Sequence, residues 1–196
     1  MILDLNQARF LGRGRTKSCY EHPLDATKCI KLVTNPKANP RELQKELREL
    51  TRVNDWAHPR VLIPKYYGEA LTNLGVGYVF DRVISPAGEA YPTLRLFLET
   101  SEVSAEQVAT LLESLSQVLG ESGILFSELN VDNVFLLHSE ASSEKRQFAI
   151  VDGFGEGSAI RLGEFIPFFA ASKVQRKFQV LRQEVNAILT RKRKTQ

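Results

Sequence analysis

The chain has 196 residues, 43% of them hydrophobic and 25% charged, a composition that is ordinary for a soluble globular protein and argues against intrinsic disorder. Its net charge of +3 averages three unlike regions: residues 1–65 carry +6 (13 basic, 7 acidic), residues 66–171 carry −10 (5 basic, 15 acidic) and residues 172–196 carry +7 (8 basic, 1 acidic). This division disfavours a uniformly basic nucleic-acid binder.

Several protein classes are disfavoured by what the sequence lacks. No basic region followed by a long apolar stretch opens the chain, so we expect no secretory signal. No apolar run approaches the ~20 residues of a membrane-spanning helix. Two cysteines, Cys19 and Cys29, are too few for a disulfide scaffold. The three histidines, His22, His58 and His138, lack metal-ligand spacing, which argues against a zinc site. We therefore expect a cytoplasmic protein.

The first part of the sequence predicts a small sheet with one helix. Short strands are expected at Cys19–Tyr20, Lys28–Val33, Leu62–Tyr67 and Gly75–Val83. A turn at Glu21–Asp25 joins the first two strands, and residues 68–73 separate the last two. Between the two pairs, Arg41–Val53 spaces its apolar residues by 4, 3 and 3 positions, which predicts a helix.

The second part predicts mainly helices. Ser104 and Gln107 have the spacing of a capping box, so a helix should begin there and end near Gly120 and Gly123. An amphipathic helix is expected from about Ser172 to Thr190. Two short apolar runs lie between the helices and flank an exposed loop at 138–147: Val134–Leu137 and Phe148–Val151.

This order of elements predicts an α+β protein in two parts. Residues 1–84 would form an antiparallel β-sheet with one helix, and residues 85–196 a reduced, mainly helical unit that ends in a basic helix and tail.

Two glycines one residue apart, Gly12 and Gly14, lie in the segment Leu11–Ser18. Such a loop lets the backbone turn sharply and approach a phosphate. A Walker A loop needs Gly directly before the lysine, where this chain has Thr16, and a dinucleotide fold needs a helix after the glycines, where we expect a strand. Two interpretations remain: a strand–loop–strand unit over nucleotide phosphates, with Lys17 beside them, or a plain hairpin with a basic loop.

Lys31 lies in an apolar strand, where an unpaired ammonium group is costly to bury, so we expect a carboxylate partner. Of the three candidates on the following helix, Glu42, Glu46 and Glu49, the second fits best because its neighbours form the apolar stripe. Such an ion pair would hold the lysine over the phosphates of ATP. The alternative is a surface lysine on an edge strand.

Two later segments carry oxygen ligands suited to a magnesium ion. Asn133 ends a loop before a short strand, and Asp152 ends an apolar strand before the turn Gly153–Gly155. Their amide and carboxylate oxygens are hard ligands of the kind that Mg²⁺ prefers. Each segment alone is ordinary. Together, and in this order, the glycine loop, the strand with Lys31 and the segments with Asn133 and Asp152 indicate a kinase-like nucleotide site.

These segments resemble a protein-kinase-like fold and, more specifically, the YrbL family of the PhoP regulatory network in enteric bacteria. The similarity rests on LGRGRTKSCYEHPLDATKCIKLV, GVGYVFDRV, NVDNVFLL and VDGFGEGS, and it covers about residues 8–165. The resemblance implies a reduced two-lobe kinase-like fold with ATP and Mg²⁺ as cofactors.

The resemblance also implies a role for each site residue. Over the adenine it would place Leu11, Cys19 and Cys29, and beneath it Phe135. The segment Phe80–Val83, with Asp81 and Val83, would hydrogen-bond the purine edge. The glycine loop would cover the phosphates with Gly12, Gly14 and Lys17. Catalytic groups would be Lys31, Glu46, Glu128 and Asp152, and magnesium ligands Asn133 and Asp152.

Departures from the kinase pattern concern the chemical step. Glu128 stands where active kinases have the catalytic-base Asp, Ser127 replaces a basic residue, and Asn130 replaces the lysine that steadies the transferred phosphate. An extra methylene displaces the carboxylate by about 1 Å, and the missing lysine removes stabilisation of the transition state. Only 41 residues follow Gly155, without a peptide-holding segment, so a small-molecule or unusual acceptor is expected.

The basic end of the chain has three interpretations: a helix packed on the acidic part with a solvated end, which we favour, contact with anionic lipid, or contact with nucleic acid. Two functions remain open. One is an ATP- and magnesium-dependent phosphotransferase; the other is a pseudokinase that senses nucleotide or binds a partner without catalysis.

Overall fold

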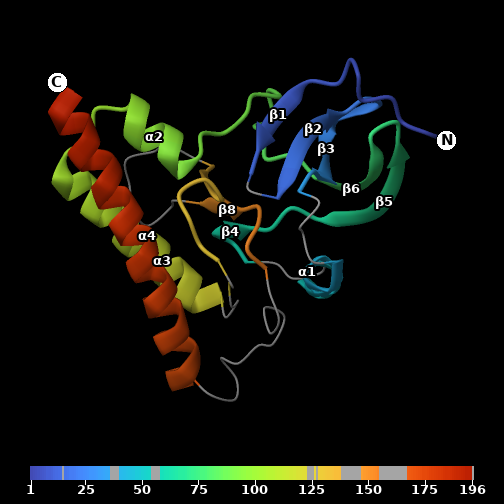
Figure 1. Ribbon diagram of the computed structural model, residues 1–196. Helices are drawn as coiled ribbons and strands as arrows, with labels where there is room; N and C mark the ends of the chain where they lie inside the picture. The colour runs from blue at the N-terminus through green and yellow to red at the C-terminus, as the bar shows by residue number, and fades with distance from the viewer. Residues whose placement is uncertain are drawn as a thin grey trace.

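The computed structural model describes residues 1–14, 16–35, 40–53, 58–122, 126, 128–137, 147–154 and 167–195. Arg15, Ser127, Gly155 and the predicted loop at 138–146 lie outside the described residues. Strands from the first part of the chain form one sheet, and the later helices gather on the other side of a second, small sheet (Figure 1). The α+β prediction is therefore confirmed.

The larger sheet is antiparallel and has the strand order β1-β2-β3-β6-β5. Two-residue turns, at Pro23–Leu24 and Asn73–Leu74, connect β2 to β3 and β5 to β6. Helix α1 spans Pro40–Val53 and leads away from the end of β3. The strands are β1 Phe10–Arg13, β2 Lys17–His22, β3 Asp25–Val33, β5 Tyr66–Thr72 and β6 Gly75–Asp81.

The smaller sheet has the order β4-β8-β7, with β4 parallel to β8 and β7 antiparallel to it. This sheet joins distant parts of the chain, because β4 comes before β5 and β6 of the larger sheet, whereas β7 and β8 come after α3. Its strands are β4 Val61–Leu62, β7 Val134–Leu136 and β8 Phe148–Ile150. The helices beside it are α2 Leu94–Thr100, α3 Ala105–Ser122 and α4 Pro167–Thr195.

One predicted strand is divided in the structure. The run Leu62–Tyr67 contains Pro64, which has no N–H to donate, and the chain forms β4 before this residue and β5 after it. Residues 68–73, predicted to separate two strands, belong mostly to β5. The misleading signal was Gly68, which adopts a positive φ of 108° where the register of β5 shifts, so the glycine marks a bulge rather than a turn.

The helix boundaries are close to those predicted, with one addition. The capping box before α3 is confirmed, since Ser104 N–H donates to Gln107 Oε1 (2.8 Å) and Gln107 N–H donates to Ser104 Oγ (3.1 Å). Helix α2 was not predicted; its seven residues begin after Thr93, whose hydroxyl oxygen accepts a hydrogen bond from Leu96 N–H (3.1 Å). Helix α4 extends beyond both predicted ends.

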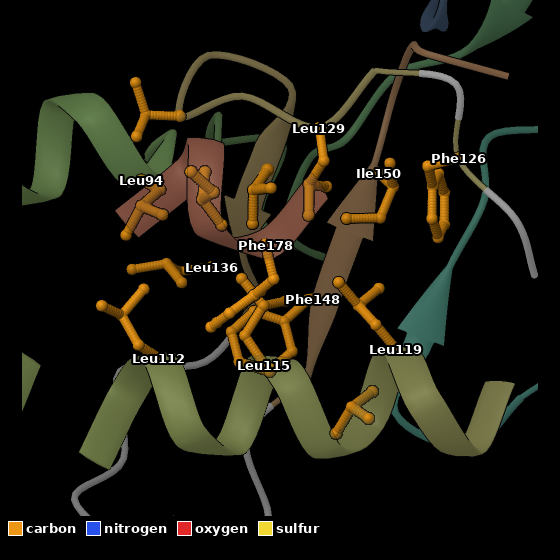
Figure 2. Packing of buried hydrophobic residues seen from close by; sticks show 14 of the residues in the cluster. Leu94, Leu112, Leu115, Leu119, Phe126, Leu129, Leu136, Phe148, Ile150 and Phe178 are labelled. Carbon is orange, nitrogen blue, oxygen red and sulfur yellow. The ribbon is translucent and has the colours of Figure 1, made fainter. Parts of the chain in front are cut away.

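The main core lies between the small sheet and the three later helices (Figure 2). Leu115 of α3 and Leu181 of α4 are fully buried against Phe148 and Ile150 of β8. The same cluster extends to Cys29 and Phe80 of the larger sheet. Its other buried members include Leu94, Leu98, Leu111, Leu119, Phe126, Leu129, Val131, Phe178 and Val185. Thus the core that fixes β8 also fixes the loop before β7.

None of the helices that the structure describes combines the length and the apolar character needed to cross a lipid bilayer.

Candidate functional site

The two faces of the larger sheet have different surroundings. Side chains alternate along a strand, and Ile30 and Leu32 of β3 pack beneath Leu3 and Leu5 of the N-terminal segment. The intervening residues of β3 face the other way. Since Cys19 of β2 pairs with Lys31 of β3, the opposite face presents four predicted site residues: Lys17, Cys19, Cys29 and Lys31. The strand register therefore brings both lysines and both cysteines to one surface.

The ion pair on this surface differs from the predicted one. Lys17 Nζ, not Lys31 Nζ, lies against both carboxylate oxygens of Glu46, at 2.7 and 2.6 Å, and both side chains are 17% exposed. Lys17 Nζ is also 3.6 Å from Asp152 Oδ1. The prediction that Lys31 forms an ion pair with Glu46 is wrong. In the strand register Lys17 lies opposite Val33, the last residue of β3, and α1 follows that end of β3 along the chain.

Lys31 has a different partner on the same surface. Its Nζ donates a hydrogen bond to the carbonyl oxygen of Val151 (2.6 Å) and lies 4.7 Å from the centre of the Phe80 ring. Val151 directly precedes Asp152. The two lysines thus hold the end of β8 against the larger sheet, one through a backbone carbonyl and the other through a carboxylate.

The turn after β8 brings Asp152 close to the loop before β7. Val151 N–H donates to the carbonyl oxygen of Asn133 (3.1 Å). Of the two predicted magnesium ligands, Asn133 directly precedes β7 and Asp152 follows β8, and these two strands are paired. Gly153 has a φ of 88°, and its N–H donates to Asp152 Oδ1 (2.9 Å). A Cβ atom at Gly153 would overlap with the carbonyl oxygen of Glu128, so this close approach requires glycine.

The charged groups on this surface shift one another's pKa values. Burial and the neighbouring Asp152 carboxylate both raise the pKa of Glu46, and Lys17 lowers it. The result is a pKa of about 7. Burial alone would raise the pKa of Asp152, but Lys31 and Lys17 together hold it well below its usual range. Burial alone would lower the pKa of Lys31, yet the Asp152 charge keeps it raised. Asp152 is therefore ionised at neutral pH, whereas Glu46 is only partly ionised there.

The residues predicted around the adenine fall into two apolar clusters. Leu11 and Cys19 pack against the main core beside Cys29 and Phe80. Val83 and Phe135 lie together in a second cluster that also contains Tyr91, Leu137, Ala149 and Val151. Hydrogen bonding with the Cys29 thiol lowers the pKa of Cys19, and the same contact, with burial, raises the pKa of Cys29.

The Asp81 side chain is bonded to residues at the start of β5. Its carboxylate accepts hydrogen bonds from Lys65 N–H (3.1 Å) and from the Tyr67 hydroxyl (2.9 Å), both on the β5 side. Its carbonyl oxygen accepts a long contact from Cys29 Sγ at 3.7 Å. Any contact between Asp81 and a purine would therefore come from the backbone.

A backbone hydrogen bond spans the glycine loop. Gly14 N–H donates to the carbonyl oxygen of Lys17 (2.8 Å), which closes the turn between β1 and β2. No described atom lies within 4 Å of a Cβ built at Gly12, and at Gly14 the nearest is that carbonyl oxygen at 3.8 Å. Neither glycine has a positive φ. The fold of the described residues therefore does not explain these two glycines, and the space beside Gly12 is open.

The loop that holds Glu128 is braced by two residues that the sequence did not single out. Arg95 of α2 donates from its backbone to the Val131 carbonyl (3.1 Å), and Glu184 of α4 accepts a hydrogen bond from Val131 N–H (3.0 Å). Arg95 also binds Asp132 through two hydrogen bonds of 2.6 and 2.9 Å. One signal was available, because Glu184 is the only acidic residue in 172–196.

The Glu128 side chain is exposed at the edge of this surface. Its Oε1 accepts a hydrogen bond from Asn130 Nδ2 (3.3 Å), and its N–H donates to the Gly153 carbonyl (3.3 Å). Asn130 Oδ1 in turn accepts from Asp132 N–H and Asn133 N–H, at 3.1 and 3.0 Å. Two of the three departures from the kinase pattern, Glu128 and Asn130, thus contact each other in one turn.

Residues 3–186 match the family described as PhoP regulatory network protein YrbL. The chain belongs to the YrbL family. Two relatives in this family, both named "Uncharacterized protein YrbL", from Escherichia coli K12 and Shigella flexneri, are 31% identical over 182 residues. These matches cover 89% of this chain and 84% of each relative.

Among solved structures, the chain is similar to the kinase domain of PknI from Mycobacterium tuberculosis. Two double-mutant forms of that domain match with a TM-score of 0.51 and 17% identity over 74% of this chain. The match spans only 58% and 56% of those chains. The YrbL family therefore has a kinase-like fold, and this likeness concerns the fold alone.

Proposed function

We propose that this YrbL-family protein binds ATP together with Mg²⁺ on the surface formed by β2, β3, α1 and the turn after β8. One observation carries the proposal: Lys17, Lys31, Glu46 and Asp152, from four separate elements, converge in a single charged group. Two ammonium groups beside one ionised carboxylate suit a ligand that brings both phosphates and a divalent cation.

The described residues fit a magnesium ion that is shared with phosphates. Asp152 offers a carboxylate and Asn133 an amide oxygen, from the paired ends of β8 and β7. Within the described ranges no three His, Cys, Asp or Glu side chains gather closely enough to hold a metal by themselves. One carboxylate and one amide oxygen are the ligand set expected when phosphates and water complete the coordination. When bound, the ion would neutralise phosphate charge.

The apolar residues would hold the base and the glycines the phosphates. Leu11, Cys19 and Cys29 would cover one side of the adenine, with Phe135 on the other and Val83 at the purine edge. The open space beside Gly12 supports a close approach of the loop to phosphate oxygens.

Phosphoryl transfer to an acceptor is the further step that we propose. Glu128 is exposed and lies next to Gly153, so its carboxylate could accept a proton from an acceptor hydroxyl that attacks the γ-phosphorus as the bond to ADP breaks. A second function, nucleotide sensing without catalysis, is favoured by Asn130. This residue is bonded to Glu128 and brings no positive charge to the transferred phosphate.

A nucleotide titration tests the binding proposal. We expect ATP with Mg²⁺ to raise the unfolding temperature of the protein and to bind with measurable heat, and we expect Asp152→Ala to abolish the magnesium-dependent part. Asp4→Ala is the matched control, because it removes an exposed aspartate of the N-terminal segment, whose Leu3 and Leu5 pack on the other face of the larger sheet. Absence of any ATP effect on the unmodified protein would contradict the proposal.

Catalysis is tested separately by measuring ADP formation with candidate small-molecule acceptors. Turnover that Asp152→Ala abolishes would support a phosphotransferase. Binding without turnover, together with turnover gained in Glu128→Asp, would support a nucleotide-sensing protein whose site is one methylene away from catalysis.

A further inference from the structure

Lys17 occupies an unusual place in the charged group. Its ammonium lies against both oxygens of Glu46 and 3.6 Å from Asp152 Oδ1, so it is the cation that both carboxylates share. A divalent cation ligated by Asp152 would lie about 2.0–2.1 Å from the same carboxylate. Two cations held this close on one carboxylate repel each other strongly, unless anionic phosphates lie between them.

The two lysines of the group differ in their freedom to move. Lys31 lies within β3, paired to Tyr78 on one side and Cys19 on the other, and donates to the Val151 carbonyl. Lys17 is the first residue of β2, directly after the glycine loop. No described atom lies within 4 Å of a Cβ position at Gly12, so this part of the loop before β2 is not tightly packed. Of the two ammonium groups, that of Lys17 is the one placed to transfer to a ligand.

We propose that Lys17 is an internal cation that occupies the Glu46–Asp152 carboxylate pair in the ligand-free protein and transfers to the phosphates when a metal–nucleotide complex binds. This inference rests on the proposed function. It gives Lys17 two opposite effects: the lysine lowers the affinity of the site for a free divalent ion, and it raises the affinity for the metal–nucleotide complex. Selectivity for metal bound to nucleotide follows from this single side chain.

The test measures both affinities on the full chain. Free Mn²⁺, a hard cation that suits the same oxygen ligands, is titrated without nucleotide, and binding is followed by loss of the free-ion EPR signal. ATP with Mg²⁺ is titrated by calorimetry. The variant Lys17→Met removes the ammonium group but keeps the length of the side chain. Lys28→Met is the matched control, because Lys28 lies in the neighbouring strand and pairs with Asp25 (2.8 Å).

We expect Lys17→Met to bind free Mn²⁺ about tenfold more tightly and ATP with Mg²⁺ about tenfold more weakly than the unmodified protein. Lys28→Met should change neither affinity. A purely structural role for Lys17 would weaken both affinities together. The double variant Lys17→Met/Glu46→Gln, which leaves no unpaired charge at Glu46, should keep the gain for Mn²⁺ and guards against a folding defect in the single variant.

Unchanged or weaker Mn²⁺ binding in both the single and the double variant would overturn the inference. Unchanged or tighter binding of ATP with Mg²⁺ by Lys17→Met would also overturn it, because the ammonium would then not reach the phosphates. Failure of the proposed function has a different signature: the unmodified protein itself would show no ATP binding, whatever the Mn²⁺ titrations give.

Discussion

Gly153 adopts a φ of 88° beside Asp152, and any side chain there would meet the carbonyl oxygen of Glu128. We expect Gly153→Ala to lower the free energy of unfolding by about 3 kcal/mol or more, since strain and backbone overlap add together. Gly12→Ala is the control, because no described atom lies within 4 Å of its Cβ and its stability should change by less than about 1 kcal/mol. Urea unfolding of both variants checks this; equal stabilities would contradict it.

Glu46 gives the protein a pH dependence. Its folded-state pKa of about 7 lies above the ordinary 4.5, so between these values the folded state binds more protons than the unfolded state. The stability that comes from this proton is fully present below about pH 4.5 and is lost as the pH rises through 7. Glu46→Gln removes this loss, so the unmodified protein should lose stability relative to the variant between pH 5 and pH 8.

Thermal unfolding of both proteins at several pH values measures this difference. Glu69→Gln is a suitable control, since Glu69 is an exposed residue of β5 and its replacement should leave the pH profile unchanged. A constant difference between the unmodified protein and Glu46→Gln across this range would show that the carboxyl group does not titrate there.

Single residues were predicted well where a local pattern carried them and poorly where the partner was distant. Asp152 and Asn133 followed from strand ends and turn residues, and the structure puts them beside paired strands, after β8 and before β7. The partner of Glu46 could not be read from the chain, because Lys17 and Lys31 face the same surface and only the three-dimensional position of α1 selects between them. The roles proposed for these residues stay predictions.

The elements show the same limit. Helix α3 was predicted from its capping box, whereas α2 was missed because seven residues show too few turns for a periodic signal. Helix α4 packs on α2 and α3 through Phe178, Leu181, Val185 and Ile188, as the favoured interpretation of the basic end expected. Lys192 also binds the end of α2, since its Nζ donates to the carbonyls of Leu98 (3.1 Å) and Ser101 (2.7 Å).

Glu184 connects α4 to the loop that holds Glu128. Its carboxylate accepts the hydrogen bond of Val131 N–H, and Val131 is fully buried. Glu184→Ala leaves that N–H without its partner, which costs about 1–3 kcal/mol of stability. Amide hydrogen exchange at Val131 should therefore become faster in the variant. Gln183→Ala, at the exposed neighbouring position of α4, should leave this exchange rate unchanged, and so should Glu184→Ala if the loop is held by Arg95 alone.

The uneven charge of the chain acquires a physical meaning in the fold. The basic first region provides Lys17 and Lys31, and the acidic middle region provides Asp152. The proposed division at residues 84 and 85 separates the groups that would meet phosphate from those that would hold the metal. The main core nevertheless crosses this division, since Cys29 and Phe80 belong to the same apolar cluster as Leu98 and Leu115.

We therefore expect the chain to unfold in one cooperative step that a ligand shifts as a whole. At 100 times its dissociation constant, ATP with Mg²⁺ should add about 2.7 kcal/mol to the free energy of unfolding, which raises the melting temperature of a chain of this size by roughly 5–11 °C. Calorimetry and circular dichroism should report the same single midpoint with and without ligand. Two transitions, with only one shifted by ATP, would instead mean that residues 1–84 and 85–196 fold independently and that one of them binds the nucleotide alone.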